Sequence, residues 1–136
     1  MSYGAAAALQ AAIYQHLAAD STLQGLIGSN IYDDVPPGPL PGTYVSLGIE
    51  DVRDRSDKTG RGALHILTVS VVSDAAGFQV AKTVAAAVSD ALSGAALSLA
   101  RGVLVYLAFE RARARRAGTS DRRRIDLRFR ARVDDG

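Results

Sequence analysis

The chain contains no cysteine and no tryptophan, and its two histidines, His16 and His65, stand far apart. Without cysteine there is no disulfide, thiolate zinc site or cysteine nucleophile. The histidines show no His-x-x-x-His or Glu-x-x-His spacing, so we expect them to serve in packing or strand pairing and expect no metal site. Walker A and Gly-x-Ser-x-Gly motifs are missing, and "GRGALH" from Gly60 lacks the third glycine of a dinucleotide-binding fingerprint. The sequence therefore predicts a protein that is not an enzyme and has no cofactor.

Long apolar runs are also missing, because no stretch of about 18 uncharged apolar residues occurs. The N-terminus lacks the basic start of a signal peptide, so we expect it to be a retained helix. Apolar residues make up 48% of the chain and charged residues 22%, which is typical of a soluble globular domain. We therefore expect residues 1–136 to form a single domain with its own core.

The first third of the chain contains a helical pattern and then a proline cluster. Residues 5–19 are rich in alanine, with apolar residues three or four apart, which predicts a helix. Gly25 and Gly28 then predict a turn. All four prolines lie within residues 36–41, which can be neither helix nor central strand because proline lacks the amide donor. Residues 43–50 alternate between apolar and other side chains, which predicts the first strand.

In the middle of the chain, a charged segment is followed by an apolar one. Residues 51–62 carry seven charges and two glycines, which predicts an exposed charged loop. Residues 63–72 are apolar on both faces of a strand. This pattern predicts an interior strand, covered on both sides or on one side by a partner subunit.

A second helix is expected over residues 75–92. Ser73 or Asp74 is the expected N-cap, and Gly94 stands where a C-cap belongs. The apolar stripe of this helix repeats every four residues, at Val80, Val84, Val88 and Leu92.

Two segments rich in apolar residues and arginine close the chain, at residues 101–116 and 121–133. We expect them to pair as a long hairpin joined by residues 117–121. The order is then helix, strand, strand, helix, strand, strand. It predicts one α+β domain with helices packed on a sheet of about four strands.

Ten of the chain's sixteen basic residues lie within residues 111–132. In the last strand, apolar side chains occupy the odd positions and charged side chains most of the even ones, so arginine forms the polar face of a half-buried strand. In the preceding strand, the odd positions change from apolar to arginine after Phe109. We interpret this change as a hairpin whose far half, residues 111–124, projects beyond the core as a basic tip.

Pairing Phe109 with Phe129 sets the predicted register of this hairpin. It places three pairs opposite each other: Glu110 and Arg128, Val105 and Val133, Arg115 and Arg123. Like charges at the tip repel, so we expect the tip to prefer an acidic partner. A solvated strand face is the alternative for Arg128–Arg132, and a small nucleic-acid-binding module is the alternative for the whole segment. The second alternative requires exposed aromatic rings for stacking, whereas both phenylalanines of this register point inward.

The segments "IYDDVPP" and "YVSLG", less than ten residues apart, and "VSVVSDAAG" before a long helix resemble the tail-completion or tail-terminator proteins of long-tailed phages and gene transfer agents. With the N-terminal helix and the closing hairpin, the resemblance covers nearly the whole chain. It implies a structural particle component, a hexameric ring that caps the tail tube, stops its polymerisation and joins the tail to the head. A neighbouring head-tail connector protein of similar size is a further alternative.

The resemblance also implies partners and a location. The partners are other copies of the chain, the tail tube protein and a connector or neck protein, with DNA only as cargo passing through the ring and no membrane. The protein would assemble in the cytoplasm of the bacterial host and lie at the head-tail junction of the particle.

Charge is unevenly distributed: residues 1–68 carry four basic and seven acidic groups, and residues 69–136 carry twelve and seven. A ring needs heterologous contacts, in which one patch of each subunit meets a different patch of its neighbour. We therefore predict that an acidic surface meets the basic hairpin. The predicted interface residues are Arg111, Arg113, Arg115, Arg116, Arg122, Arg123, Arg124, Asp33, Asp34, Asp51 and Asp54.

Overall fold

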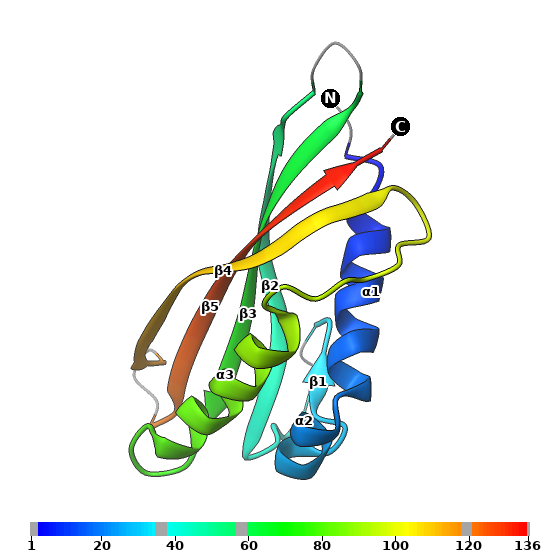
Figure 1. Ribbon diagram of the computed structural model, residues 1–136. Coiled ribbons are helices and arrows are strands. Elements are labelled where there is room, and N and C mark those ends of the chain that lie inside the picture. The colour runs from blue at the N-terminus through cyan, green and yellow to red at the C-terminus, as the bar shows by residue number, and fades with distance from the viewer. Residues whose placement is uncertain (1–2, 35–37, 57–59, 118–120, 136) are drawn as a thin grey trace.

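The computed structural model describes residues 3–34, 38–56, 60–117 and 121–135, and within them five strands form one mixed sheet in the order β1-β2-β3-β5-β4. Three helices cover one face of this sheet (Figure 1). The elements are α1 (Ala6–Ala19), α2 (Ser21–Ile27), β1 (Ile31–Tyr32), β2 (Thr43–Asp54), β3 (Gly62–Ser73), α3 (Gln79–Leu92), β4 (Val103–Arg116) and β5 (Arg123–Asp134). The predicted α+β domain with a C-terminal hairpin is confirmed, with one helix and one short strand more than expected.

Helix α1 forms as predicted, and its apolar side chains Leu9, Ile13 and Leu17 are buried against the rest of the domain. His16 lies in its last turn, where the imidazole Nε2 donates a hydrogen bond of 2.8 Å to the carbonyl oxygen of Ala91. This histidine therefore ties α1 to α3, which agrees with the packing role expected from the sequence.

The turn predicted around Gly25 is instead part of helix α2. Asp20 caps this helix, because its carboxylate accepts a hydrogen bond of 3.0 Å from the backbone N–H of Leu23. Leu23 and Ile27 are buried in the core. A glycine inside a helix costs only about 1 kcal/mol relative to alanine, so the cap and the burial outweigh it. Gly28, with a φ of +61°, ends the helix.

Helix α3 begins later than predicted, at Gln79, and neither Ser73 nor Asp74 caps it. The hydroxyl of Ser73 instead lies 2.9 Å from that of Thr43, where β2 and β3 meet. Gly77 has a φ of +74°, a left-handed conformation that separates the end of β3 from the helix. The sequence pattern extended the helix through this turn because two alanines precede the glycine.

The apolar stripe of α3 is confirmed at Val84, Val88 and Leu92, which are buried, but Val80 is exposed. Gly94 follows the C-terminal cap residue of the helix with a φ of +72°. This is the left-handed conformation that glycine commonly adopts just after a helix.

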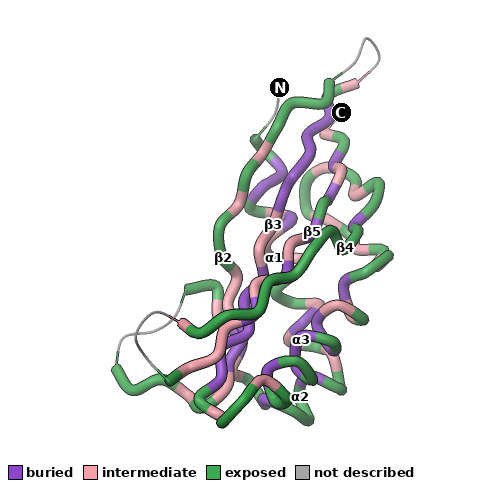
Figure 2. Tube along the Cα trace, turned by 90° about the vertical axis from the view of Figure 1, so that its left-hand side faces the viewer, coloured by how far each residue is buried: buried purple, intermediate pink, exposed green. Residues whose placement is uncertain are grey.

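The core lies between the three helices and the covered face of the sheet (Figure 2). Central strand β3 is buried along most of its length on both faces, as predicted. Its even-numbered residues face the side of the sheet without helices, which we call the open face. Leu64 and Ile66 are buried there opposite Arg132 and Arg130 of β5. Long arginine stems are apolar enough to cover such side chains.

The charged loop predicted at residues 51–62 is shorter than expected, because β2 continues to Asp54 and pairs with β3 up to Ala63. An irregularity of the pairing between Leu47 and Glu50 lets the strand continue. Residues 57–59 of this loop, Pro36 and Pro37 of the proline cluster, and residues 118–120 of the hairpin loop lie outside the described residues.

The closing hairpin pairs Phe109 with Phe129, as predicted, with ring centroids 5.9 Å apart in an edge-to-face arrangement. The predicted register also holds from Tyr106 to Ala108, but beyond this stretch it is wrong, because β4 has two register shifts, at Val105 and Glu110, where an extra residue is inserted. The observed pairs are Leu104 with Val133, Arg111 with Arg128, Arg115 with Arg124 and Arg116 with Arg123.

The irregularity at Glu110 also explains why the odd positions of β4 change from apolar to arginine. One extra residue shifts the alternation of faces by one, so Phe109 before it and Ala112 after it both lie on the helix side. β5 is buried as far as Ile125, beside this half of β4. The interpretation of residues 111–124 as a tip beyond the core is therefore corrected: their described strands continue the sheet.

Candidate interaction surface

A row of arginines, Arg111, Arg113 and Arg115 of β4, lies on the open face of the sheet next to Arg124 and Arg128 of β5. These side chains line a hollow of about 340 Å³, which we call the arginine hollow. Its remaining lining residues come from β2, β3 and β5: Gly48, Ile49, Thr68, Ser70 and Asp126.

Asp126 organises one side of the arginine hollow. One of its carboxylate oxygens accepts hydrogen bonds from the hydroxyl of Ser70 at 2.6 Å and from Nε of Arg124 at 2.9 Å. Arg115 approaches the other oxygen at 3.6 Å. Burial alone would raise the pKa of Asp126, but these hydrogen bonds and the two guanidinium charges together lower it. Arg124 and Arg115 are thus engaged within the chain.

Arg111 and Arg113 differ from their neighbours, because neither has a hydrogen-bond or ion-pair partner within the described residues. The arginines on either side are paired: Arg128 and Arg130 each lie 3.7 Å from a carboxylate oxygen of Glu110. Two adjacent guanidinium groups of the row therefore remain available to bind groups outside the chain.

The other predicted arginines lie apart from this row. Arg122 donates a hydrogen bond of 3.1 Å to the carbonyl oxygen of Pro41, and its guanidinium carbon lies 5.9 Å from the centre of the Tyr44 ring. Arg123 stacks over Phe78 at 5.7 Å. Arg116 is an exposed residue at the end of β4, paired with Arg123 in register. Arg122 and Arg123 therefore hold the turn end of the hairpin against the domain, so the seven predicted arginines do not form a single patch.

The predicted acidic residues also separate. Asp51 lies on the open face, 3.6 Å from Arg53, and both are exposed. Asp54 binds the backbone N–H and hydroxyl of Ser56, which lowers its pKa and holds the start of the loop. Asp33 and Asp34 follow β1 and are exposed, but only Asp33 lines a groove.

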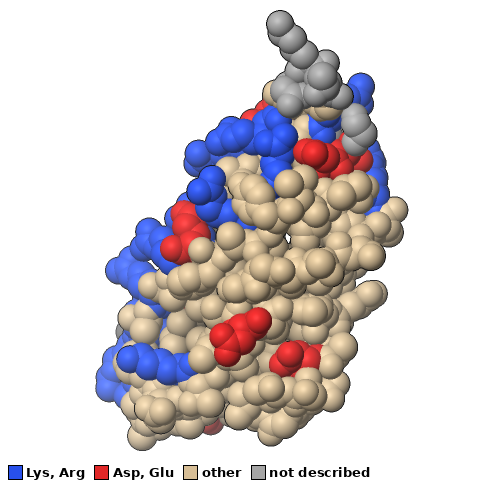
Figure 3. Space-filling view, viewed as in Figure 1, with Lys and Arg blue, Asp and Glu red and all other residues tan. Residues whose placement is uncertain are grey.

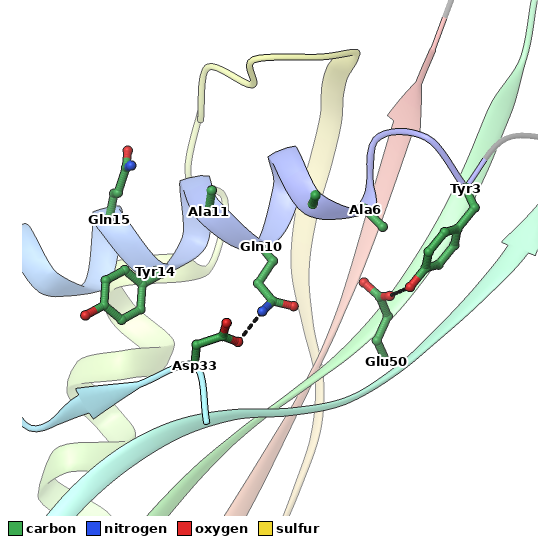
Figure 4. Close-up of a pocket in the computed structure, with 9 residues that line it drawn as sticks. Tyr3, Ala6, Gln10, Ala11, Tyr14, Gln15, Asp33 and Glu50 are labelled. Carbon is green, nitrogen blue, oxygen red and sulfur yellow. Dashed lines mark hydrogen bonds between the residues drawn. The ribbon is translucent and has the colours of Figure 1, made fainter. Parts of the chain in front are cut away.

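This groove, which we call the acidic groove, runs between α1 and β2 and measures about 580 Å³ (Figure 4). Its polar walls are held from inside: the Tyr3 hydroxyl donates to Glu50 at 2.7 Å, and the side-chain amide of Gln10 donates to Asp33. The lining residues are Tyr3, Ala6, Ala7, Gln10, Ala11, Tyr14, Gln15, Asp33 and Glu50. It contains two carboxylates and no basic side chain.

Sequence reasoning missed Glu50 and Tyr3 as members of this site. Glu50 was part of the expected first strand, and nothing in its neighbours distinguishes it from other strand carboxylates. Tyr3 is separated from it by 47 positions. The two meet only because the segment that precedes α1 lies beside β2 (Figure 4), and no local pattern encodes that contact.

Behind the acidic groove lies His65, whose side chain is wholly buried. Neither ring nitrogen has a hydrogen-bond partner within the described residues, and Nδ1 lies 3.8 Å from Oε2 of Glu50. Burial lowers the pKa of His65, and the charge of Glu50 opposes this effect only in part. His65 is therefore more than the strand-pairing residue predicted, because it lies directly behind a carboxylate of the groove.

The depressed pKa of His65 predicts a pH-dependent stability. The unfolded chain takes up a proton below the ordinary histidine value of 6.5, whereas the folded chain stays neutral until a lower pH. The free energy of unfolding should therefore fall as the pH drops below 6.5, by at most about 1.4 kcal/mol per pH unit, and level off below the folded pKa. Urea denaturation between pH 7.5 and pH 4.5 measures this.

A His65→Leu variant serves as the control for this measurement. It should lose most of the slope in this range, while Asp126, whose pKa is lowered, affects stability only at more acidic pH. An unchanged slope in His65→Leu would assign the effect to other groups.

Charge divides the surface of the protein. Seen from the helix side, basic side chains gather along the margin formed by β4 and β5, while the helical middle is largely uncharged with isolated acidic groups (Figure 3). None of the helices in the described ranges is long and apolar enough to span a membrane. Surface regions of different charge are typical of a protein that binds other macromolecules.

Comparison with known proteins identifies that class more closely. The family model described as "Tail completion protein gp17" matches residues 11–134, so the chain belongs to the tail-completion protein family. A chain in a solved structure of the virion of a native gene transfer agent particle is 65% identical, with a TM-score of 0.93. The match covers 98% of this chain and 99% of that chain. No curated protein matches the sequence. The resemblance inferred from the sequence is confirmed, and the chain belongs to a family of structural tail proteins.

Proposed function

We propose that this protein is a tail terminator, a hexameric ring that caps the tail tube of a phage-like particle, stops its growth and joins the tail to the head. The observation that carries this proposal is the family membership, together with 65% identity over nearly the full length to a component of a gene transfer agent virion. The proposed partners are other copies of the chain, the tube protein and a connector or neck protein. DNA would pass through the ring as cargo.

The two unlike faces of the domain suit this role. A closed ring is built from heterologous contacts, so each subunit needs two different complementary surfaces. The acidic groove lies on the helix side of the sheet and the arginine hollow on the open face. A protein that must also touch a tube below and a connector above needs further exposed surface, which the long edge strand β4 offers.

Removing the gene from a particle-producing host tests the proposal. Without a terminator, tube polymerisation has no defined end and heads have no surface to bind. Electron micrographs should then show tubes of uneven length and heads without tails, and complementation with the intact gene should restore uniform tailed particles. Tails of normal length, joined to heads, would contradict the proposed function.

Binding to nucleic acid offers a second check. The arginine hollow includes Asp126 and has no aromatic lining residue, so the stacking platforms of single-strand binders are missing from it. We therefore expect only weak, sequence-independent retention of DNA. Tight binding that falls steeply with salt would favour a nucleic-acid-binding module instead.

A further inference from the structure

We propose that neighbouring copies of this chain bind each other by placing Arg111 and Arg113 of one copy in the acidic groove of the next, against Asp33 and Glu50. The proposal deepens the proposed function, because it names the surfaces that join the ring. It differs from the acidic side predicted from the sequence, because Asp51 lies near Arg53 and Asp54 binds Ser56, and the proposal uses Glu50 in their place.

The donating surface has two guanidinium groups without a partner among the described residues. Arg111 and Arg113 are exposed residues of the outermost strand, and their backbone is held in the sheet opposite Arg128 and Asp126 of β5. Positive charges outnumber negative ones around them, because Arg115, Arg124 and Arg128 line the same hollow together with Asp126. A carboxylate brought by another molecule would relieve this repulsion.

The accepting surface has the complementary composition. Asp33 and Glu50 each accept one hydrogen bond from within the chain, from Gln10 and Tyr3, and a carboxylate has further lone pairs to offer. The groove wall between them is made of the small side chains Ala6, Ala7 and Ala11, along which a long arginine stem can lie. Figure 4 shows Gln10 and Tyr3 directed toward the two carboxylates across this space.

A second observation concerns the side of Glu50 away from the groove. His65 is wholly buried there, and neither of its ring nitrogens has a hydrogen-bond partner within the described residues. Its Nδ1 lies 3.8 Å from Glu50. Burial lowers the pKa of His65, which disfavours a positive charge on the imidazole behind Glu50, so the proposed cation for this carboxylate comes from the groove side.

The positions of the two surfaces favour a ring. The acidic groove and the arginine hollow lie on opposite faces of the sheet, so the arginines of one copy cannot enter the groove of the same copy. The contacts therefore continue from copy to copy in one direction. Figure 4 shows the two carboxylates at separate points of the groove, Asp33 beside Gln10 and Glu50 beside Tyr3, so two arginines of one strand would each meet one carboxylate.

Charge exchange tests this pairing on the full-length protein. Arg111→Glu with Arg113→Glu makes both surfaces acidic, and Asp33→Lys with Glu50→Lys makes both basic. Each variant alone should lose self-association by about a hundredfold or more, because like charges now face each other at every contact. Mixed in equal amounts, the two should associate again, since an even-numbered ring can alternate them. The mass of the assembly by light scattering is the readout.

Matched controls separate this effect from net charge and from misfolding. Asp34→Lys changes a neighbouring exposed carboxylate that does not line the groove, and Arg53→Glu changes an arginine of the open face outside the hollow. Both should associate normally. If the Glu50 substitution lowers the melting temperature, Asp33→Lys alone, at an exposed position, is mixed with the arginine variant instead. Failure of mixing to restore association, with both variants folded, overturns the proposal.

Assembled particles provide the same test where purified protein stays monomeric. The chain has no cysteine, so Asp33→Cys with Arg113→Cys introduces the only two thiols of the protein. A short bifunctional thiol reagent should link neighbouring copies into a ladder of multimers, whereas Asp34→Cys with Arg53→Cys should not. The absence of a ladder in tailed particles contradicts this pairing while leaving the tail-terminator role standing. A ladder in these particles, combined with normal tails in a host that lacks the gene, contradicts the role alone.

Discussion

Replacing Arg111, Arg113 and Arg115 by glutamate should abolish assembly of this protein with its ring neighbours or the tail while leaving its fold intact. The three side chains are exposed on the outermost strand, so their reversal removes no core contact. Only Arg115 has a partner within the described residues, and Asp126 would keep its bonds to Ser70 and Arg124. Juxtaposed like charges cost several kcal/mol in an interface, compared with roughly 1 kcal/mol or less for exposed pairs within a fold.

The measurement combines thermal unfolding with complementation of a host that lacks the gene. The variant should melt within a few degrees of the natural protein and yet restore no tailed particles. A control with the same change of net charge replaces Arg53, Arg61 and Lys82 by glutamate, three basic residues outside the arginine hollow. Tailed particles in normal number from the first variant would remove this row from every interface.

Truncating Phe129 to alanine should produce the largest loss of stability of any single substitution considered for this chain. Phe129 is among the largest side chains that are fully buried, with 0% exposure, and it lies on β5 between β3 and β4. Removing a buried phenylalanine typically costs about 3–5 kcal/mol, because the lost transfer energy is increased by the cavity left behind. For a domain of this size, that loss is a large part of the total stability.

Phe109→Ala provides the comparison for this prediction. Its ring contacts Phe129 at 5.9 Å but is 44% exposed, so the loss should be less than half as large. Urea denaturation of both variants at pH 7.5 gives the two free energies. Equal losses would show that the hairpin contact, and not burial under the helices, holds Phe129 in place.

Local patterns predicted most of the elements. The alternation of apolar and charged residues in β5 gave the correct face for Ile125, Leu127 and Phe129, because successive side chains of a strand point to opposite faces and the helices cover one face of this sheet. Alanine content and the spacing of apolar residues located α1, because one side of this helix packs on the core. Both patterns repeat often enough within one element to be read without knowing what packs against it.

Elements that depend on one or two residues were missed. Helix α2 contains a glycine and depends on the cap by Asp20, while β1 has only two residues and exists because it pairs with β2. The inserted residue Glu110 is a similar case, because the positions of apolar residues and arginines in β4 fit two structures. Either the alternation of side chains between the two faces shifts by one residue, or the strand leaves the core of the domain. Only the pairing with β5 in the structure distinguishes the two.

The sequence by itself determined the α+β class, the amphipathic strands, the excess of arginine near the C-terminus and the resemblance to tail-completion proteins. These follow from composition and short periodicity, which act within a single element. The tertiary structure alone decided that Arg111 and Arg113 have no partner in the described part of the chain while Arg122 and Arg124 are engaged, and that Tyr3, Asp33 and Glu50 share a groove. Whether a charge is available depends on which distant side chains come within a few ångströms of it, and that follows from the packing of the whole chain.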